Sequence, residues 1–371
     1  MNKLLITKDT LIKGSLKQYN LESYFDTPNI NRIFKDGAVF QNHFSAAPST
    51  AMSISSIITG KYAFELGRKK YSKVSEYIGE TLFTKASKLG FHCYLLVPDY
   101  WDGWLKYINA FENVEVIFYS KNELLDFSKF SDKLLEFNNE KTFLWIHLPH
   151  VIRPKNAYGS DIDLLDEFLG EVSSRNIFDD YYLTSDHGQM NLHKGIMNYG
   201  FDLYQNAINV PMISSRKADK VYIDNVTSHI DMYNIIFETA PFLRKYVISE
   251  TAYEFQGHRK IAVMDNRFKL IYSKFFNRFE LYDYLYDKNE NFNILRIKKW
   301  DFMRGKFYYF NQVFFYPHYK LSENSRNYLM SIFDDVHTKD FFLVEAYLKF
   351  KVLIRFIVYP LINILKLRRF L

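Results

Sequence analysis

The sequence contains a single cysteine, Cys93, so no disulfide can form within the chain. A reducing compartment is therefore allowed, although it is not required. Cys93 lies in the apolar run G-F-H-C-Y-L-L-V, which has the length and composition of a strand. Because free cysteines are among the most buried residues in proteins, we interpret Cys93 as a small hydrophobic core residue.

The chain also lacks an apolar N-terminal segment long enough for a signal peptide or a membrane span. Its first apolar run, L-L-I-T, is broken by Lys8 and Asp9 and has only the length of a strand. We therefore expect no signal peptide and a chain that starts inside its folded domain, which favours the cytoplasm. The net charge of +6 is mild for 371 residues. With no nucleic-acid-binding motif, we expect no nucleic-acid partner.

What the sequence has in abundance is apolar surface. Hydrophobic residues make up 48% of the chain and aromatic residues 18%. Such a chain can bury a sizeable core, which excludes global disorder. A length of 371 residues indicates one large domain with a smaller attachment.

Strand-like and helix-like patterns alternate in the first half of the chain. Helical spacing occurs at 77–89 and 161–174, and there is no internal repeat. This alternation predicts an α/β fold, a mostly parallel sheet with helices on both faces. The runs with the length of a strand are 4–7, 93–97, 114–119, 142–147 and 180–184.

The texture changes after residue 245. The runs 261–264 and 268–272 read as a β-hairpin. We divide the chain into a catalytic α/β domain (1–245), a small α+β subdomain (246–298) and a helical basic and apolar tail (299–371). The uncharged run 356–365 is about half of what a membrane span needs. We expect the tail to lie on an anionic membrane surface, with a helix packed on the domain or at a subunit contact as the alternative.

Polar side chains follow several of the predicted strands, at the sheet edge where functional groups gather. Asp9 follows the first strand and could ligate a divalent cation or cap a helix. Asp186 and His187 follow another strand in T-S-D-H-G. Oxygen with imidazole suits Zn or Mn better than Mg or Ca, and the alternative is an ordinary polar loop after a strand. His147 and His150 come at the end of a further strand, and His193 lies beyond His187. These three histidines could contact a phosphoryl group or protonate a leaving group, or be ordinary loop residues.

Thr50 lies in the hydroxyl-rich segment A-A-P-S-T-A-M-S, which then takes on helical spacing. The segment reads as a loop entering a helix N-terminus, a place that favours an anion. A hydroxyl there could attack a phosphorus centre if a metal lowers its pKa. The alternative is a simple cap rich in serine and threonine.

Taken in order, these elements resemble the sulfatase/alkaline phosphatase superfamily. The resemblance lies in L-L-I-T-K-D-T, T-P-N-I-N-R-I-F-K-D-G-A-V-F, the segment ending T-G-K-Y, L-P-H, S-D-H-G with its later histidine, and E-L-Y-D. It implies that Thr50 occupies the nucleophile position. In the sulfatases that the chain resembles, this position is a Cys or Ser that is oxidised to an aldehyde and is followed by P-x-R. Thr50 is followed by A-M-S-I, so the resemblance disfavours sulfate ester hydrolysis.

A threonine at this position is similar to the phosphoethanolamine and phosphoglycerol transferase branch. By that resemblance one divalent ion is held by Asp9, Thr50, Asp186 and His187. His150 and His193 would contact the phosphoryl group, and His147 or His193 would protonate the leaving alcohol. That branch usually has Glu at the position of Asp9 and carries N-terminal membrane helices, and this chain departs from both features.

The sequence therefore predicts a phosphotransferase that moves a phosphate-linked group from a phosphate-ester donor to a glycan or lipid acceptor through a phosphothreonine. We expect it in the cytoplasm, peripheral on the inner face of the membrane through its tail. The alternative is a phosphoesterase or phosphodiesterase, or a sulfuric ester hydrolase-like protein. A non-catalytic scaffold would have broken ligands, and all four predicted ligands are present in the sequence.

Overall fold

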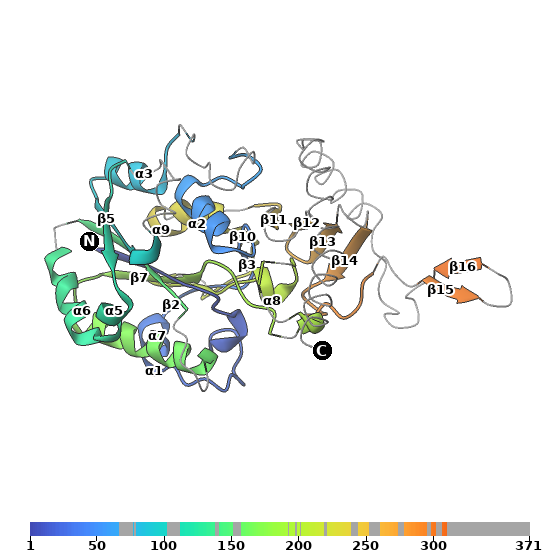
Figure 1. Cartoon of the computed structure of the whole chain (residues 1–371), viewed down its shortest axis with the longest axis horizontal. Coiled ribbons are helices and arrows are strands. Elements are labelled where there is room, and N and C mark those ends of the chain that lie inside the picture. The colour runs from blue at the N-terminus through green and yellow to red at the C-terminus, as the bar shows by residue number, and fades with distance from the viewer. Residues whose placement is uncertain are drawn as a thin grey trace, which may run out of the picture.

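The computed structural model contains a large sheet with helices on both faces and a small sheet beside it (Figure 1). The described residues are 1–66, 77, 79–101, 112–137, 141–150, 157–191, 193–196, 199–200, 202–218, 221–238, 244–251, 260–273, 278–294, 298–301 and 306–309.

The large sheet has eight strands in the order β5-β4-β6-β1-β7-β8-β2-β9. Seven of the strands run in the same direction. β8 runs in the opposite direction and is antiparallel to both of its neighbours, β7 and β2. The predicted α/β class is confirmed. The strands are β1 (Lys3–Lys8), β2 (Gly37–Phe40), β4 (His92–Pro98), β5 (Glu115–Tyr119), β6 (Thr142–Leu148), β7 (Asp180–Ser185), β8 (Met212–Lys217) and β9 (Tyr222–Ile223).

The five strands predicted from apolar runs are all present. In β1, β6 and β7 every residue is buried, because helices cover both faces of the sheet centre. The apolar runs do not predict the strands β2, β8 and β9. β8 reads M-I-S-S-R-K and becomes exposed towards its end, so its apolar run is too short to signal a buried strand.

Helices form one layer on each face of the large sheet (Figure 1). The first layer shares a core with one face of β1 and β6, and the second packs on the other face. The first comprises α1 (Pro28–Phe34), α5 (Lys121–Leu125), α6 (Phe127–Leu134) and α7 (Ala157–Ser174), and the second α2 (Thr50–Thr59), α3 (Leu82–Lys88) and α9 (Met232–Phe237). The helical pattern predicted for 161–174 is confirmed.

The helix predicted over 77–89 begins later than expected. Thr81 is the N-cap of α3, and its hydroxyl accepts from the Thr84 backbone N–H at 3.1 Å. Thr84 in turn binds the Thr81 N–H at 2.7 Å, which completes a capping box. This pair of hydrogen bonds fixes the start of the helix at Leu82.

The small sheet is antiparallel and lies beside the large one (Figure 1). It consists of β11 (Val247–Glu250), β12 (Lys260–Met264), β13 (Phe268–Ser273) and β14 (Arg278–Asp283). The predicted hairpin is confirmed, because β12 pairs with β13 and the Asp265 carboxylate accepts from the backbone N–H groups of Arg267 and Phe268. The short helix α8 (Gln205–Ile208) and the pair β3 (His43–Phe44) and β10 (Thr227–Ser228) complete the description of this part.

The start of the predicted helical tail is different in the structure. The strands β15 (Lys298–Asp301) and β16 (Lys306–Tyr309) form an antiparallel pair there. The remainder of the tail, including the uncharged run 356–365, lies outside the described residues. Among the described residues no helix is both long and apolar enough to cross a membrane.

A buried ion pair fastens the small sheet to the segment that follows it. Lys269 Nζ on β13 lies 2.6 Å from Glu290 Oε1, and both side chains are fully buried. Burial lowers the pKa of Lys269, and the Glu290 charge opposes that shift. Glu290 also accepts from the Gln205 N–H at 2.8 Å, which ties α8 to the same pair.

We expect Lys269→Met to lower the free energy of unfolding by about 3–5 kcal/mol, because it leaves a buried carboxylate unpaired. The double variant Lys269→Met/Glu290→Gln is expected to recover at least half of that loss. Urea denaturation followed by circular dichroism measures both values. A single variant within about 1 kcal/mol of the wild type would show that the pair does not stabilise this region.

Candidate metal centre and active site

Four side chains that are distant in the sequence meet at the carboxyl edge of the large sheet. β1 and β7 are neighbours in parallel register, with Lys8 opposite Ser185. Asp9 and Asp186, the next residue of each chain segment, are therefore carried to the same place. His187 follows at once, and Thr50 is the first residue of α2.

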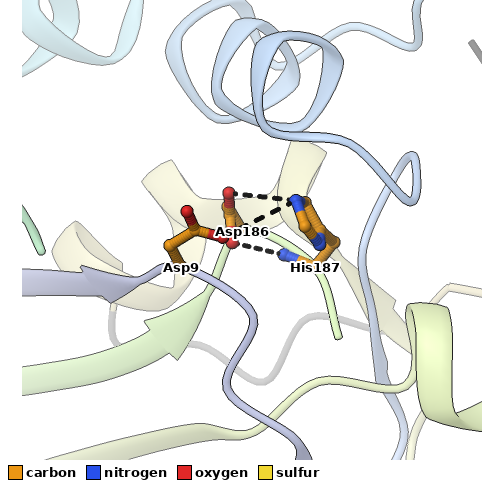
Figure 2. Close-up of side chains that lie close together, drawn as sticks. All are labelled: Asp9, Asp186 and His187. Carbon is orange, nitrogen blue, oxygen red and sulfur yellow. Dashed lines mark hydrogen bonds and ion pairs between the residues drawn. The ribbon is translucent and has the colours of Figure 1, made fainter. Parts of the chain in front are cut away.

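The ligand atoms of Asp9, Asp186 and His187 all lie within 4.8 Å of one another. Figure 2 shows the three side chains turned towards a common point. His187 Nε2 is 3.4 Å from Asp186 Oδ2 and 3.9 Å from Asp9 Oδ1. Asp186 and His187 are fully buried, whereas the Asp9 side chain retains 17% of its exposure. The cluster is thus open to solvent on the side of Asp9.

The hydrogen bond made by the other nitrogen of His187 fixes its tautomer. Nδ1 lies 2.9 Å from the carbonyl oxygen of Gly188, which can only accept, so Nδ1 carries the proton. In the neutral ring, Nε2 therefore presents a lone pair to the two carboxylates. Neither carboxylate can donate a hydrogen bond to this nitrogen while it is ionised, so three acceptor groups face one another.

Each of the two carboxylates also has an oxygen without a hydrogen-bond partner in the described part of the chain. Asp9 Oδ1 and Asp186 Oδ2 are buried and have no hydrogen-bond partner among the described residues. The second Asp186 oxygen accepts from the backbone N–H groups of Thr10 and His187, at 3.2 and 2.8 Å. Burial raises the pKa of Asp9, and the nearby Asp186 charge raises it further. Two carboxylates and an imidazole lone pair in this arrangement fit a divalent cation.

Thr50 stands beside this cluster at a helix N-terminus. Its Oγ1 is 3.2 Å from His187 Nε2. The loop before α2 is held against the metal-ligand strand, since Ser45 Oγ lies 2.6 Å from the Asp186 carbonyl oxygen. Ser53 Oγ donates to the Ala47 carbonyl at 2.7 Å and closes the loop onto the helix. All four residues of the predicted metal set are therefore together in the structure.

Gly188 is required by the backbone packing behind the cluster. A Cβ at this position would lie 2.0 Å from the carbonyl oxygen of Asn206, a backbone atom that cannot move aside. The Gly188 N–H donates to the Ala207 carbonyl at 2.9 Å. The D-H-G sequence thus combines two ligand residues with the close approach of α8.

His147 lies in the interior, 1% exposed, with Nδ1 2.9 Å from Thr7 Oγ1 and its ring 4.3 Å from that of Trp101. Burial lowers its pKa to about 3, against the opposing charge of Asp9. The imidazole is neutral at physiological pH and sequestered from solvent. These surroundings do not favour the proton-donor role predicted for His147.

His150 is oriented by α7. Its Nδ1 forms an ion pair with the buried carboxylate of Asp161, and Lys8 Nζ lies 3.4 Å from the same carboxylate oxygen. Lys8 also donates to the Pro149 carbonyl at 3.0 Å. The histidine is therefore held against α7 by a carboxylate that also contacts Lys8 of β1. Its contact with a phosphoryl group stays a prediction.

His193 is turned towards the small subdomain. Its Nε2 lies 2.8 Å from the Asn289 carbonyl, and the neighbouring Lys194 Nζ contacts the Glu290 carbonyl. His193 is not part of the group whose ligand atoms lie within 4.8 Å of one another. Its role as a phosphoryl contact or proton donor remains a prediction.

Two tyrosines border the cluster and were not singled out from the sequence. The Tyr199 ring lies 4.4 Å from that of His187. Burial, followed by the Asp9 and Asp186 charges, raises its pKa. Burial and the Asp9 charge raise the pKa of Tyr100 to about 12. Tyr100 is the second residue after β4, so the rule of strand ends could have found it, whereas no sequence signal marks Tyr199.

Solved structures that are similar to this chain include a sulfatase and a phosphonate monoester hydrolase. A protein in complex with its substrate D-glucosamine-2-N,6-O-disulfate has a TM-score of 0.66 at 13% identity, over 91% of this chain and 97% of that one. A 2-O GAG sulfatase has a TM-score of 0.64 at 14% identity, over 80% and 87%. The phosphonate monoester hydrolase of Agrobacterium radiobacter has a TM-score of 0.61 at 15% identity, over 79% and 91%.

The chain has the sulfatase fold. No protein-family model matches it. Over 92 residues it is 33% identical to an arylsulfatase of Clostridium perfringens. That match covers 24% of this chain and 19% of the arylsulfatase, so the similarity spans about a fifth of the length of that relative.

These similarities support the superfamily-level prediction and not its finer branch. The sulfatase fold was predicted and is found. The threonine-dependent transferase branch finds no support, because the similar proteins are described as sulfatases and a phosphonate monoester hydrolase. The hydrolase alternative therefore fits better than the predicted phosphotransferase.

Proposed function

We propose that this protein is a metal-dependent hydrolase of phosphate esters that uses Thr50 as its nucleophile. The observation that carries the proposal is the position of Thr50 Oγ1, 3.2 Å from a His187 nitrogen that faces two carboxylate oxygens without partners. A hydroxyl, an imidazole lone pair and two carboxylates around one point form the donor set of a hydrolytic metal centre.

Asp9, Asp186, His187 and Thr50 would hold one divalent ion, Zn or Mn by the donor set, with Mg or Ca as poorer matches. When bound, the ion would lower the pKa of the Thr50 hydroxyl and offset negative charge on the ester. Asp186 is held by two backbone N–H groups and His187 by the Gly188 carbonyl, so both keep their orientation without the ion. Such preorganisation of the site is what electrostatic catalysis requires.

In the proposed reaction, Thr50 Oγ1 attacks the phosphorus and the ester P–O bond breaks. The hydroxyl proton of Thr50 is lost to solvent, and the departing alkoxide takes up a proton to leave as an alcohol. Water then attacks the phosphothreonine, which releases phosphate and restores Thr50. We assign the contact with a phosphoryl oxygen to His150, whose ring is oriented by Asp161.

Phosphate is favoured over sulfate because of the nucleophile. Thr50 stands where the resembling sulfatases need a residue that can be oxidised to an aldehyde, and a threonine cannot supply that group by the same route. Water is favoured over a glycan or lipid acceptor because the similar structures include a hydrolase of phosphonate monoesters and none of those described above is a transferase. Binding of an anionic membrane by the tail remains a separate expectation.

The substrate class is tested with 4-nitrophenyl phosphate, bis(4-nitrophenyl) phosphate and 4-nitrophenyl sulfate. We expect kcat/KM for one of the phosphate esters to exceed that for the sulfate by at least about 100-fold. EDTA should abolish turnover, and Zn or Mn should restore it. Activity that survives EDTA, or a preference for the sulfate, would contradict the proposal.

The same assay distinguishes hydrolysis from transfer. With 4-nitrophenyl phosphate as the substrate and glycerol added as an acceptor, hydrolysis releases inorganic phosphate in step with 4-nitrophenol. A transferase would instead form glycerol phosphate at the expense of inorganic phosphate. Quantifying both products by phosphorus NMR decides between the two reactions.

A further inference from the structure

A cavity of about 870 Å³ opens at the same edge of the large sheet. Its walls come from the segments that follow β1, β2 and β9, from α8, and from the loops at the end of the small sheet. Figure 1 shows α8 between the two sheets, where these segments converge. None of Asp9, Thr50, Asp186 and His187 lines this cavity. Its volume lies within the usual range of small-ligand sites.

The lining of the cavity is unusual in its chemistry. Nine of its eighteen lining residues are asparagine or glutamine, drawn from six separate segments of the chain. A carboxamide carries both donors and an acceptor and no net charge. The carboxamides of Asn206, Asn225 and Asn289 make no hydrogen bond to any described residue, so they are available to a ligand.

The inner wall holds an unsatisfied acceptor. Asn209 is 9% exposed, and its Oδ1 is buried without a hydrogen-bond partner among the residues that the structure describes. An unpaired buried acceptor is unfavourable, so a ligand hydroxyl that donates to it would be stabilised there. Nearby side chains are held in place, since Asn42 Nδ2 donates to the Asp224 carbonyl at 2.7 Å and Asn266 Oδ1 accepts from the Val226 N–H at 2.6 Å.

Aromatic rings and an excess of positive charge complete the cavity. Tyr222 stands at the rim with 55% of its surface exposed, and Tyr19 and Tyr284 also line the space. The lining contains two lysines, Lys13 and Lys288, and only one carboxylate, Asp224. Burial, followed by the Lys288 charge, lowers the pKa of Lys13 to about 8. An acidic group on the ligand would relieve this repulsion.

We infer that this cavity is a binding site for an acidic carbohydrate. Sugar hydroxyls both donate and accept, as the carboxamides do, and the apolar faces of sugar rings pack on tyrosine rings. A carboxylate or sulfate on the sugar would lie near Lys13 and Lys288. The inference goes beyond the proposed reaction and does not depend on it, because no residue of the metal centre takes part.

Binding is measured on the full chain with the Thr50→Ala substitution in EDTA, so that neither turnover nor metal contributes. Isothermal titration calorimetry with a hyaluronan hexasaccharide is expected to show saturable binding, at least tenfold tighter than that of maltohexaose. Tyr222→Ala and Asn289→Ala, which change exposed side chains of two different loops, should each weaken it about tenfold. Tyr24→Ala, at a fully exposed tyrosine outside the cavity, should leave binding unchanged.

Three outcomes would overturn the inference. One is that the protein binds neither the hyaluronan hexasaccharide nor maltohexaose. Another is binding that neither Tyr222→Ala nor Asn289→Ala weakens, which would place the sugar elsewhere, including at the metal centre. The third is equal binding of maltohexaose and hyaluronan, which would remove the assignment to acidic sugars. Failure of the proposed hydrolase activity would leave this test unaffected.

Discussion

Replacing Thr50 with alanine is expected to lower kcat for phosphate-ester hydrolysis by at least about 1,000-fold, because the variant has no hydroxyl to attack phosphorus. The fold should tolerate the change within about 1 kcal/mol, since within the described part of the chain the hydroxyl bonds only to His187 Nε2. Steady-state kinetics measure the first effect and thermal denaturation the second. Intact-mass spectrometry of the quenched wild-type reaction should show a phosphoryl adduct that Thr50→Ala lacks.

Two matched substitutions separate chemistry from helix stability. Thr50→Ser keeps the nucleophile and should retain measurable turnover. Thr59→Ala removes a hydroxyl at the other end of α2, which donates to the Ser55 carbonyl at 2.7 Å, and should reduce stability slightly without affecting the reaction. If Thr50→Ala kept more than about a tenth of the wild-type kcat, Thr50 would not be the nucleophile.

Replacing Asp186 with asparagine is expected to abolish metal binding and turnover while leaving the metal-free protein as stable as the wild type or more so. In the metal-free wild type, Asp186 Oδ2 is buried, unpartnered and 3.4 Å from His187 Nε2. An asparagine there can donate to that nitrogen and no longer repels Asp9. We expect a gain of about 1–2 kcal/mol in EDTA, because the Asp186 charge raises the pKa of Asp9.

The measurement compares thermal denaturation with and without metal. Zn or Mn should raise the melting temperature of the wild type by mass action and leave Asp186→Asn unchanged, and elemental analysis should find the variant free of metal. Asp180→Asn is the control on the same strand, because Asp180 pairs with Lys3 at the opposite end of β7. It should lose stability and keep its metal. Metal-dependent stabilisation of Asp186→Asn would show that the ion binds elsewhere.

Much of the large domain could be predicted from the sequence. The central strands β1, β6 and β7 are buried on both faces, so each appears as a continuous apolar run. Parallel strands bring their carboxyl ends to one edge, so the rule places Asp9 and Asp186 at the same edge, and the pairing of β1 with β7 makes them neighbours. The nucleophile role of Thr50 was predicted from the resemblance of its surroundings to a nucleophile helix. The local pattern was not enough, because a hydroxyl-rich helix cap looks the same.

Other features escape any local pattern. β8 runs antiparallel to β7, and its apolar run is too short to be distinctive. His147 and His150 stand three residues apart in one motif, yet one is buried against Trp101 and the other pairs with Asp161. Their different surroundings come from elements far away in the chain.

The sequence by itself determined the α/β class, the central strands and the candidate ligands, because strand periodicity and strand-end chemistry are local properties. Only the tertiary structure decided that His187 presents Nε2 to two unpartnered carboxylates, that Tyr199 lies against its ring, and that carboxamides from six segments line one cavity. Those arrangements are contacts between residues distant in the chain, and composition and spacing carry no record of which distant residues the packing brings together.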